Sequence, residues 1–112
     1  MKWIQHGKWI IATSIVGSFE SGSARHLIVL GADIALVGSS KKNGEMRLST
    51  RASNRIVSQG FNLTEILEKI CEVNDRSSGG HPGAAGYNGK GDPEAISEIA
   101  RQKCIDAIRQ LP

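Results

Sequence analysis

The segment DIALVGSSKKNGEMRLSTR, residues 33–51, decides how this chain folds. It begins with a continuous apolar run, which is typical of a strand buried on both faces. The Asn-Gly pair at 43–44 predicts a hairpin turn, and the strict alternation of polar and apolar residues after it predicts a second strand with one buried face. We therefore expect two neighbouring strands, with Arg47, Ser49 and Arg51 together on the polar side of the second.

Outward from this hairpin, the sequence predicts further strands and three helices. Residues 3–16 are rich in β-branched and aromatic residues, which is typical of one or two strands. Apolar residues at helical spacing predict helices over 24–30, 63–73 and 93–111, the first ended by Gly31. The order strand, helix, hairpin, helix, loop, helix indicates an α/β fold, a single domain with a mixed β-sheet and helices packed on it.

Composition narrows the class of protein. At 112 residues the chain is large enough for one core, and we expect one domain over 1–112. The net charge of +3 is compatible with an anionic ligand but is too small to identify one. There is neither an apolar run of roughly 18 residues nor a signal peptide, and both cysteines lie in helix-like apolar patterns. We therefore expect a cytoplasmic protein that does not bind a membrane.

The aromatic residues are few and scattered along the chain. Trp3, Trp9 and Phe19 are expected in the core or at an interface. Their spacing does not indicate an aromatic platform of the kind on which single-stranded nucleic acids stack.

The polar side of the predicted strand is a first candidate site. Arg47, Ser49 and Arg51 would stand about 6.5–7 Å from one another along the strand. Two guanidinium groups that flank a hydroxyl can bind an anion, because each presents paired donors that match phosphate oxygens. The alternative is an ordinary solvated strand face, in which Glu45 completes a mixed charge pattern. Taken alone, the pattern favours this alternative.

A second candidate is the segment SSGGHPGAAG, residues 77–86, which we predict to be a loop. The Gly-Gly pair can bring its backbone N–H groups to an anion, and His81 can donate a hydrogen bond to a phosphate oxygen. The alternative is a tight structural turn with a surface histidine. The long string of small residues around one histidine favours a binding role instead. The candidate binding residues of this segment are Ser78, Gly79, Gly80, His81 and Gly86.

Residues 78–86 resemble the Gly-Gly-His…Ala-Ala-Gly signature of the DHH-associated domain, the C-terminal substrate-binding domain of DHH-family, RecJ-like phosphoesterases. Residues 47–52, RLSTRA, look like the strand of that family that bears Ser-x-Arg. The two motifs occur in the order of the family, and the resemblance spans roughly residues 33–88. Many members have a longer glycine run where this chain has Ser77-Ser78, so the chain differs from the family signature at these two residues.

The resemblance implies roles for several residues. Arg51 would contact a substrate phosphate or a terminal nucleotide, and the Gly-Gly-His at 79–81 would form a loop that faces a metal site. Arg47 and Ser49 would extend the same surface, an expectation that rests on strand geometry rather than on the family signature.

In this family, the resemblance implies, an N-terminal domain holds Mn²⁺ (or Mg²⁺) on Asp and His ligands, and the DHH-associated domain closes over the phosphate substrate. The present sequence has no Asp-His-His triplet and no Asp-x-Asp, and His6, His26 and His81 show no metal-ligand spacing. We therefore expect no catalytic residue and no metal ion in this domain. Its expected role is to bind single-stranded nucleic acid or a nucleotide for a missing N-terminal catalytic domain, as part of a longer hydrolase.

Two other functions stay open. The first is an RNA-binding or dimerising C-terminal domain related to that of alanyl-tRNA synthetases, which carry a similar domain. The second is a purely structural interaction domain, in which the glycine-rich segment is only a tight turn. The sequence leaves open whether the substrate is DNA, RNA, a cyclic dinucleotide or a small phosphate compound, and whether the chain forms a homodimer.

Overall fold

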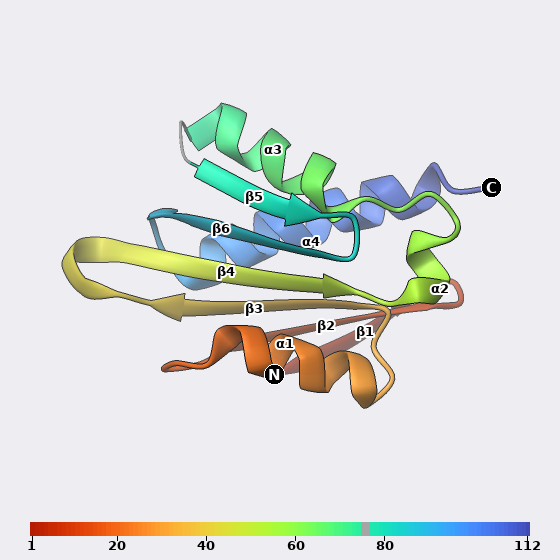
Figure 1. Cartoon of the computed structure of the whole chain (residues 1–112), viewed down its shortest axis with the longest axis horizontal. Helices are drawn as coiled ribbons and strands as arrows, with labels where there is room; N and C mark the ends of the chain where they lie inside the picture. Colours follow the sequence, from red (N-terminus) through yellow and green to blue (C-terminus); the bar gives the residue numbers. More distant parts are fainter. Residues whose placement is uncertain (75–76) are drawn as a thin grey trace.

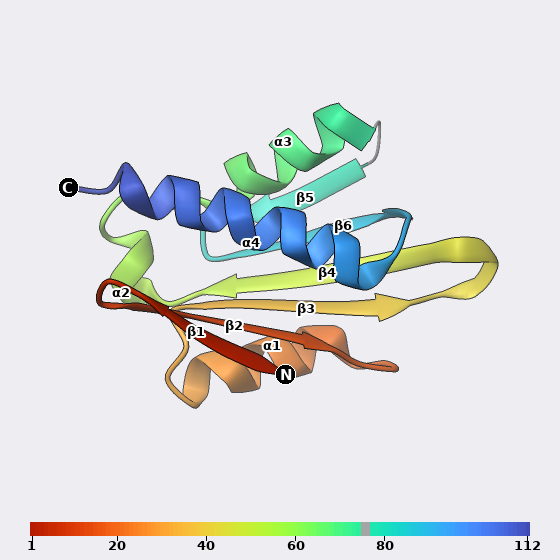
Figure 2. The same ribbon diagram turned by 180° about the vertical axis from the view of Figure 1, so that it is seen from behind.

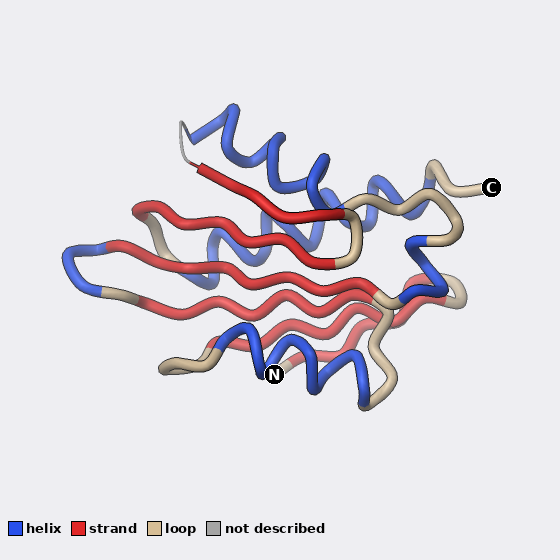
Figure 3. The backbone as a smooth tube through the Cα atoms, in the orientation of Figure 1, coloured by secondary structure: helices blue, strands red, loops and turns tan. Residues whose placement is uncertain are grey.

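A six-stranded mixed β-sheet forms the centre of the protein (Figure 1; Figure 3). The computed structural model describes residues 1–74 and 77–112, with the backbone alone at 71–74 and 77–79. The strands lie in the order β1-β2-β3-β4-β6-β5, and neighbours are antiparallel except for the parallel pair of β2 and β3. In chain order the elements are β1 (Lys2–His6), β2 (Trp9–Ile15), α1 (Glu20–Val29), β3 (Ile34–Ser40), the 3₁₀ turn η1 (Lys42–Gly44), β4 (Glu45–Ala52), α2 (Asn54–Val57), α3 (Leu63–Asn74), β5 (Ser77–His81), β6 (Ala84–Lys90) and α4 (Pro93–Arg109).

The helices cover the two faces of the sheet unequally (Figure 1; Figure 2). α1 packs on one face, where Ala24 and Leu27 join a small apolar cluster with residues of β2 and β3. α3 and α4 pack on the other face, which carries the main core, including the fully buried side chains of Leu36, Leu48 and Tyr87. The predicted α/β fold, with a mixed sheet and helices packed on it, is confirmed.

The central hairpin has the predicted form. β3 is buried at every position except Ser40, and β4 alternates so that Met46 and Leu48 are buried between less buried neighbours. At the turn, Asn43 and Gly44 both adopt left-handed backbone angles, with φ of 60° and 73°. This is the conformation that makes an Asn-Gly pair favourable in a tight hairpin.

The segment predicted as a loop, residues 77–86, is instead a β-hairpin, so that prediction is wrong. Its residues form β5 and the start of β6, joined by a turn at Pro82-Gly83. Glycine and serine have low strand propensity, and the segment is held in the sheet by its pairing with β6 and by α3. At Gly80, φ is +142°, and an added Cβ would lie 2.3 Å from the carbonyl oxygen of Ala84. The close approach of the two strands therefore requires glycine at this position.

The helix boundaries differ from the prediction at several ends. α1 begins at Glu20, earlier than the predicted residue 24, and α4 ends at Arg109 rather than at 111. The short helix α2 was not predicted; its N-cap is Ser53, whose hydroxyl accepts a hydrogen bond from the backbone N–H of Ile56. No described helix is long and apolar enough to cross a bilayer.

The structure buries Cys104 and one of the three aromatic residues that were expected in the core or at an interface. Cys104 is fully buried, and burial raises the pKa of its thiol to about 12; the side chain of Cys71 lies outside the described residues. Trp9 is in the main core. Trp3 and Phe19, by contrast, are 40% and 85% exposed, so neither belongs to the core of this chain.

Candidate anion-binding surface

Three adjacent strands bring most of the predicted site residues onto one side of the sheet, which we call the open face. The open face consists of three rows across β4, β6 and β5: Arg51, Ala84 and His81; Ser49, Gly86 and Gly79; and Arg47, Asn88 and Ser77. These positions alternate with the core residues of the same strands, so the open face is turned away from α3 and α4. α1 lies on the same side over β3 and β4, and none of the described helices lies over β6 and β5 there (Figure 1).

Two predicted site residues do not belong to the open face. Ser78 and Gly80 take the alternate positions of β5, opposite Tyr87 and Ala85, which are part of the main core. The backbone geometry expected of the glycine pair also changes. Consecutive N–H groups of an extended strand point to opposite edges, so Gly79 and Gly80 do not form a nest of converging donors.

The middle of the open face carries little side-chain bulk. Gly86 lies between Ser49 and Gly79, and Ala84 lies in the row beside it. A bound group can therefore approach the strands closely, flanked by longer side chains in the outer rows. We call this shallow central strip of small residues, Gly79, Ala84 and Gly86, the floor of the open face. Close approach of a ligand to the floor explains the run of small residues better than a turn does.

Arg51 and His81 stand on either side of this floor. They are two strands apart in one row, which places their Cα atoms about 10 Å from each other with Ala84 between them. Arg51 is half-buried. Its guanidinium group makes no hydrogen bond or ion pair with any residue of the described chain. The donors of Arg51 are thus available to a ligand.

The position and the tautomer of His81 follow from the turn that succeeds it. The carbonyl of Gly83 accepts a hydrogen bond from Ala52 N–H at 3.0 Å, and that of Pro82 accepts one from Leu63 N–H at 3.1 Å. The turn is therefore tied to the end of β4 and the start of α3. His81 Nδ1 accepts a hydrogen bond from Gly83 N–H at 3.3 Å. In this arrangement the ring proton resides on Nε2, which becomes the donor available on the exposed side.

Arg47, at the other end of the open face, is already engaged. Its Nε donates to Asn88 Oδ1 at 2.9 Å, and its Nη1 lies 3.3 Å from Oε1 of Glu20. The second oxygen of Glu20 is 3.4 Å from Lys41 Nζ. Arg47 therefore links β4 to β6 and to the start of α1, and its role is at least partly structural.

The carboxylate of Glu20 is buried beneath these two cations. Burial by itself would raise the pKa of Glu20, but a hydrogen bond from its own backbone N–H and the charge and hydrogen bond of Lys41 together hold the pKa below its ordinary value. Glu20 is thus charged near neutral pH and balances part of the positive charge at this end of the open face.

Sequence reasoning missed Ala84, Asn88 and Glu20. The alternation of small or polar residues with Ala85 and Tyr87 in residues 84–88 was a usable strand signal for the first two. The contact between Glu20 and Arg47 joins residues far apart in the sequence, and no local pattern indicates it.

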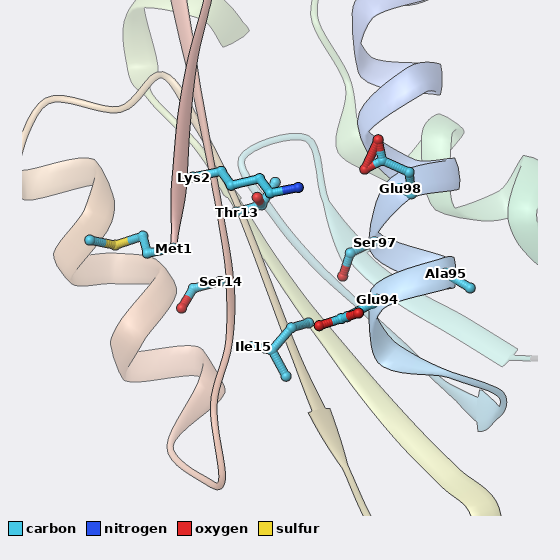
Figure 4. A pocket seen from close by; sticks show the side chains of 9 residues that line it. All are labelled: Met1, Lys2, Thr13, Ser14, Ile15, Glu94, Ala95, Ser97 and Glu98. Atoms are coloured by element: carbon cyan, nitrogen blue, oxygen red, sulfur yellow. The ribbon is translucent and has the colours of Figure 1, made fainter.

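A separate hollow of about 520 Å³ lies between the β1-β2 hairpin and α4. Figure 4 shows Lys2 and Thr13 on one side of it and Glu94, Ser97 and Glu98 of α4 on the other. Two carboxylates against one amine disfavour an anion there, and none of the predicted site residues lines it. Across the described residues, no three His, Cys, Asp or Glu side chains converge as metal ligands.

Comparison with known proteins identifies a matching domain family and a related protein sequence. Residues 23–110 match the DHHA1 domain family. An uncharacterized protein of Methanocaldococcus jannaschii is 37% identical over 89 residues, which cover 79% of this chain and 27% of that protein. The chain thus spans about a quarter of the length of this relative.

Three solved structures have the same fold. The C-Ala domain of Aquifex aeolicus alanyl-tRNA synthetase superimposes with a TM-score of 0.65 at 19% identity, over 89% of this chain and 98% of that domain. RecJ of Thermus thermophilus, solved in complex with Mg²⁺, gives 0.57 at 15% identity over 91% of this chain and 15% of RecJ. The pGpG-specific phosphodiesterase PggH of Vibrio cholerae superimposes with a TM-score of 0.56 at 14% identity, over 94% of this chain and 35% of that protein. With the family match over most of its length, this chain belongs to the DHHA1 domain family.

Proposed function

We propose that the open face holds a phosphate group of a nucleic-acid or nucleotide substrate between Arg51 and His81. The observation that carries this proposal is the half-buried guanidinium of Arg51, which has no partner among the described residues and stands in one row with His81, with only Ala84 between them. A guanidinium group offers paired donors that match phosphate oxygens, and His81 adds the Nε2 donor. Both side chains are long enough to meet above Ala84.

In this proposal the chain is the substrate-binding domain of a DHH-family phosphoesterase, and an N-terminal DHH domain carries out the hydrolysis. The chain belongs to the DHHA1 domain family, and its match covers only 27% of the Methanocaldococcus relative. Both observations support a role within a longer protein. Mn²⁺ or Mg²⁺ would belong to that other domain, where such ions activate water and stabilise negative charge. The residues of this chain would hold and orient the phosphate, and Gly86 and Gly79 would allow it to come close.

The alternative role is RNA binding or dimerisation, as a relative of the C-Ala domain. It is supported by the superposition over 98% of that domain. The two roles differ in ligand, because the first requires an accessible phosphate on a short strand or nucleotide and the second a structured RNA. Competition between short single strands and folded tRNA for the purified domain therefore distinguishes them.

The direct test is binding of a fluorescein-labelled single-stranded DNA of roughly eight nucleotides, within the range that small single-strand sites cover. Arg51→Ala is expected to weaken binding roughly 10- to 100-fold, because a charged hydrogen bond contributes about 1.5–3 kcal/mol. It should also lower the slope of log affinity against log salt by about 0.7.

Arg109→Ala is the matched control, because it removes the same charge from the exposed end of α4 on the other side of the sheet. Its affinity should stay within about twofold of wild type. Equal affinities for wild type, Arg51→Ala and Arg109→Ala would reject the proposal. Preference for folded tRNA over the short strand would favour the C-Ala-like role.

A further inference from the structure

Phe19 is held in solvent in an unfavourable backbone conformation. Its side chain is 85% exposed, and its φ of 59° places it in the left-handed region. It occupies the N-cap of α1 without a side-chain hydrogen bond to the helix. Serine, asparagine, aspartate and glycine are the residues that favour this position, because they cap the helix or tolerate the backbone angle. Neither the helix start nor the core therefore explains an aromatic residue here.

The location of Phe19 connects it to the open face. The next residue, Glu20, contacts Arg47 of the open face at 3.3 Å and Lys41 at 3.4 Å. Figure 1 shows that α1 begins at the end of the sheet where the β3-β4 hairpin lies. Phe19 therefore stands at the Arg47 end, where Arg47 and Lys41 both contact the carboxylate of Glu20.

We infer that Phe19 stacks on a base of a nucleic-acid strand whose phosphate lies between Arg51 and His81. This inference rests on the proposed function and names its ligand as a strand of several nucleotides. Arg47 and Arg51 are four residues apart on β4, which separates them by about 14 Å. Phe19 adjoins Glu20, which contacts Arg47 at the far end of this stretch, so a single nucleotide held at Arg51 does not reach Phe19. An exposed aromatic ring next to cations is the usual arrangement for stacking the bases of single strands.

The test uses two labelled ligands of equal length: a short oligothymidylate and an abasic strand with the same sugar-phosphate backbone. Phe19→Ala is expected to weaken oligothymidylate binding about 5- to 100-fold, in line with base stacking on aromatic residues. Binding of the abasic strand should stay within about twofold of wild type. Phe19→Trp should retain the affinity for oligothymidylate, because the larger ring also stacks.

Two further variants separate stacking from structural effects. Phe19→Asn suits the left-handed backbone, so it should fold at least as stably as wild type and yet bind oligothymidylate as weakly as Phe19→Ala. Val29→Ala removes another exposed apolar side chain, 76% exposed at the far end of α1, and should change neither affinity.

The outcomes distinguish this inference from the proposed function. If Phe19→Ala changes the two affinities equally, or changes neither, while Arg51→Ala weakens both, the stacking role is refuted and the phosphate site stands. If Arg51→Ala also changes neither, or if wild type binds neither strand, the proposed function fails and the inference fails with it.

Discussion

Replacement of Gly80 by alanine should destabilise the fold strongly, although the change adds one methyl group at the sheet edge. The new Cβ would lie 2.3 Å from the Ala84 carbonyl oxygen and 2.5 Å from the Ala85 Cα, both backbone atoms that cannot turn aside. The φ of +142° adds conformational strain of about 1–3 kcal/mol, and relief of the overlap costs a further ~1–3 kcal/mol. A loss near 3 kcal/mol lowers the urea midpoint by about 2 M at an m-value of about 1.5 kcal/mol/M.

The matched control is Gly86→Ala in the neighbouring strand. There the added Cβ would be 3.7 Å from the Leu48 carbonyl oxygen, an ordinary contact, and the backbone angle is not left-handed. Its unfolding midpoint, followed by circular dichroism in urea, should stay close to that of wild type, while the methyl group on the floor of the open face weakens oligonucleotide binding. Equal unfolding midpoints for Gly80→Ala and wild type would refute the argument that the close approach of β5 and β6 requires glycine at residue 80. Unchanged oligonucleotide binding by Gly86→Ala would refute the claim that a ligand approaches the open face closely at Gly86.

Two further predictions concern buried charges. Asp33 is 3% exposed and accepts hydrogen bonds from Arg55, Ser53 and the backbone N–H of Ile10. Asp33→Ala should therefore lower the free energy of unfolding by about 3 kcal/mol, measured in heat or urea. The control Asp106→Ala, at an exposed position, should lower it by less than about 0.5 kcal/mol. For Glu20, the folded pKa lies below the ordinary 4.5, so its carboxylate stabilises the fold above pH 4.5 and this contribution is lost as pH falls through the folded value. Glu20→Gln should therefore be less stable than wild type at pH 7, with the difference vanishing in acid; a difference that persists at pH 2.5 would contradict the assignment.

The elements predicted from sequence are those whose local patterns agree with their tertiary surroundings. The β3-β4 hairpin combines a buried apolar run, an Asn-Gly turn and strict alternation, and all three point to the same structure. β5 lacks every such signal, because its serines and glycines have low strand propensity and its place is decided by pairing with β6. The short helix α2 rests on a single serine cap and is too brief for a periodic pattern.

The candidate site was predictable as a set of residues but not as an arrangement. Arg47, Ser49 and Arg51 share a strand face, as alternation requires. Arg51 and His81 stand in one row only because β6 lies between β4 and β5. This strand order is a non-local feature of the topology. The removal of Gly80 from the binding surface follows from the same register, as does the structural engagement of Arg47 with Asn88.

The central claim is that Arg51 and His81 hold the same phosphate group, and a double-mutant cycle on oligonucleotide affinity tests it most directly. The four proteins are wild type, Arg51→Ala, His81→Ala and the double variant, each titrated with the same single strand at one salt concentration. Two donors that share one phosphate are coupled, so we predict an interaction free energy of about 1 kcal/mol or more, with the double variant losing less than the sum of the single losses. Additive losses within about 0.3 kcal/mol would show that the two side chains act separately and would contradict the claim.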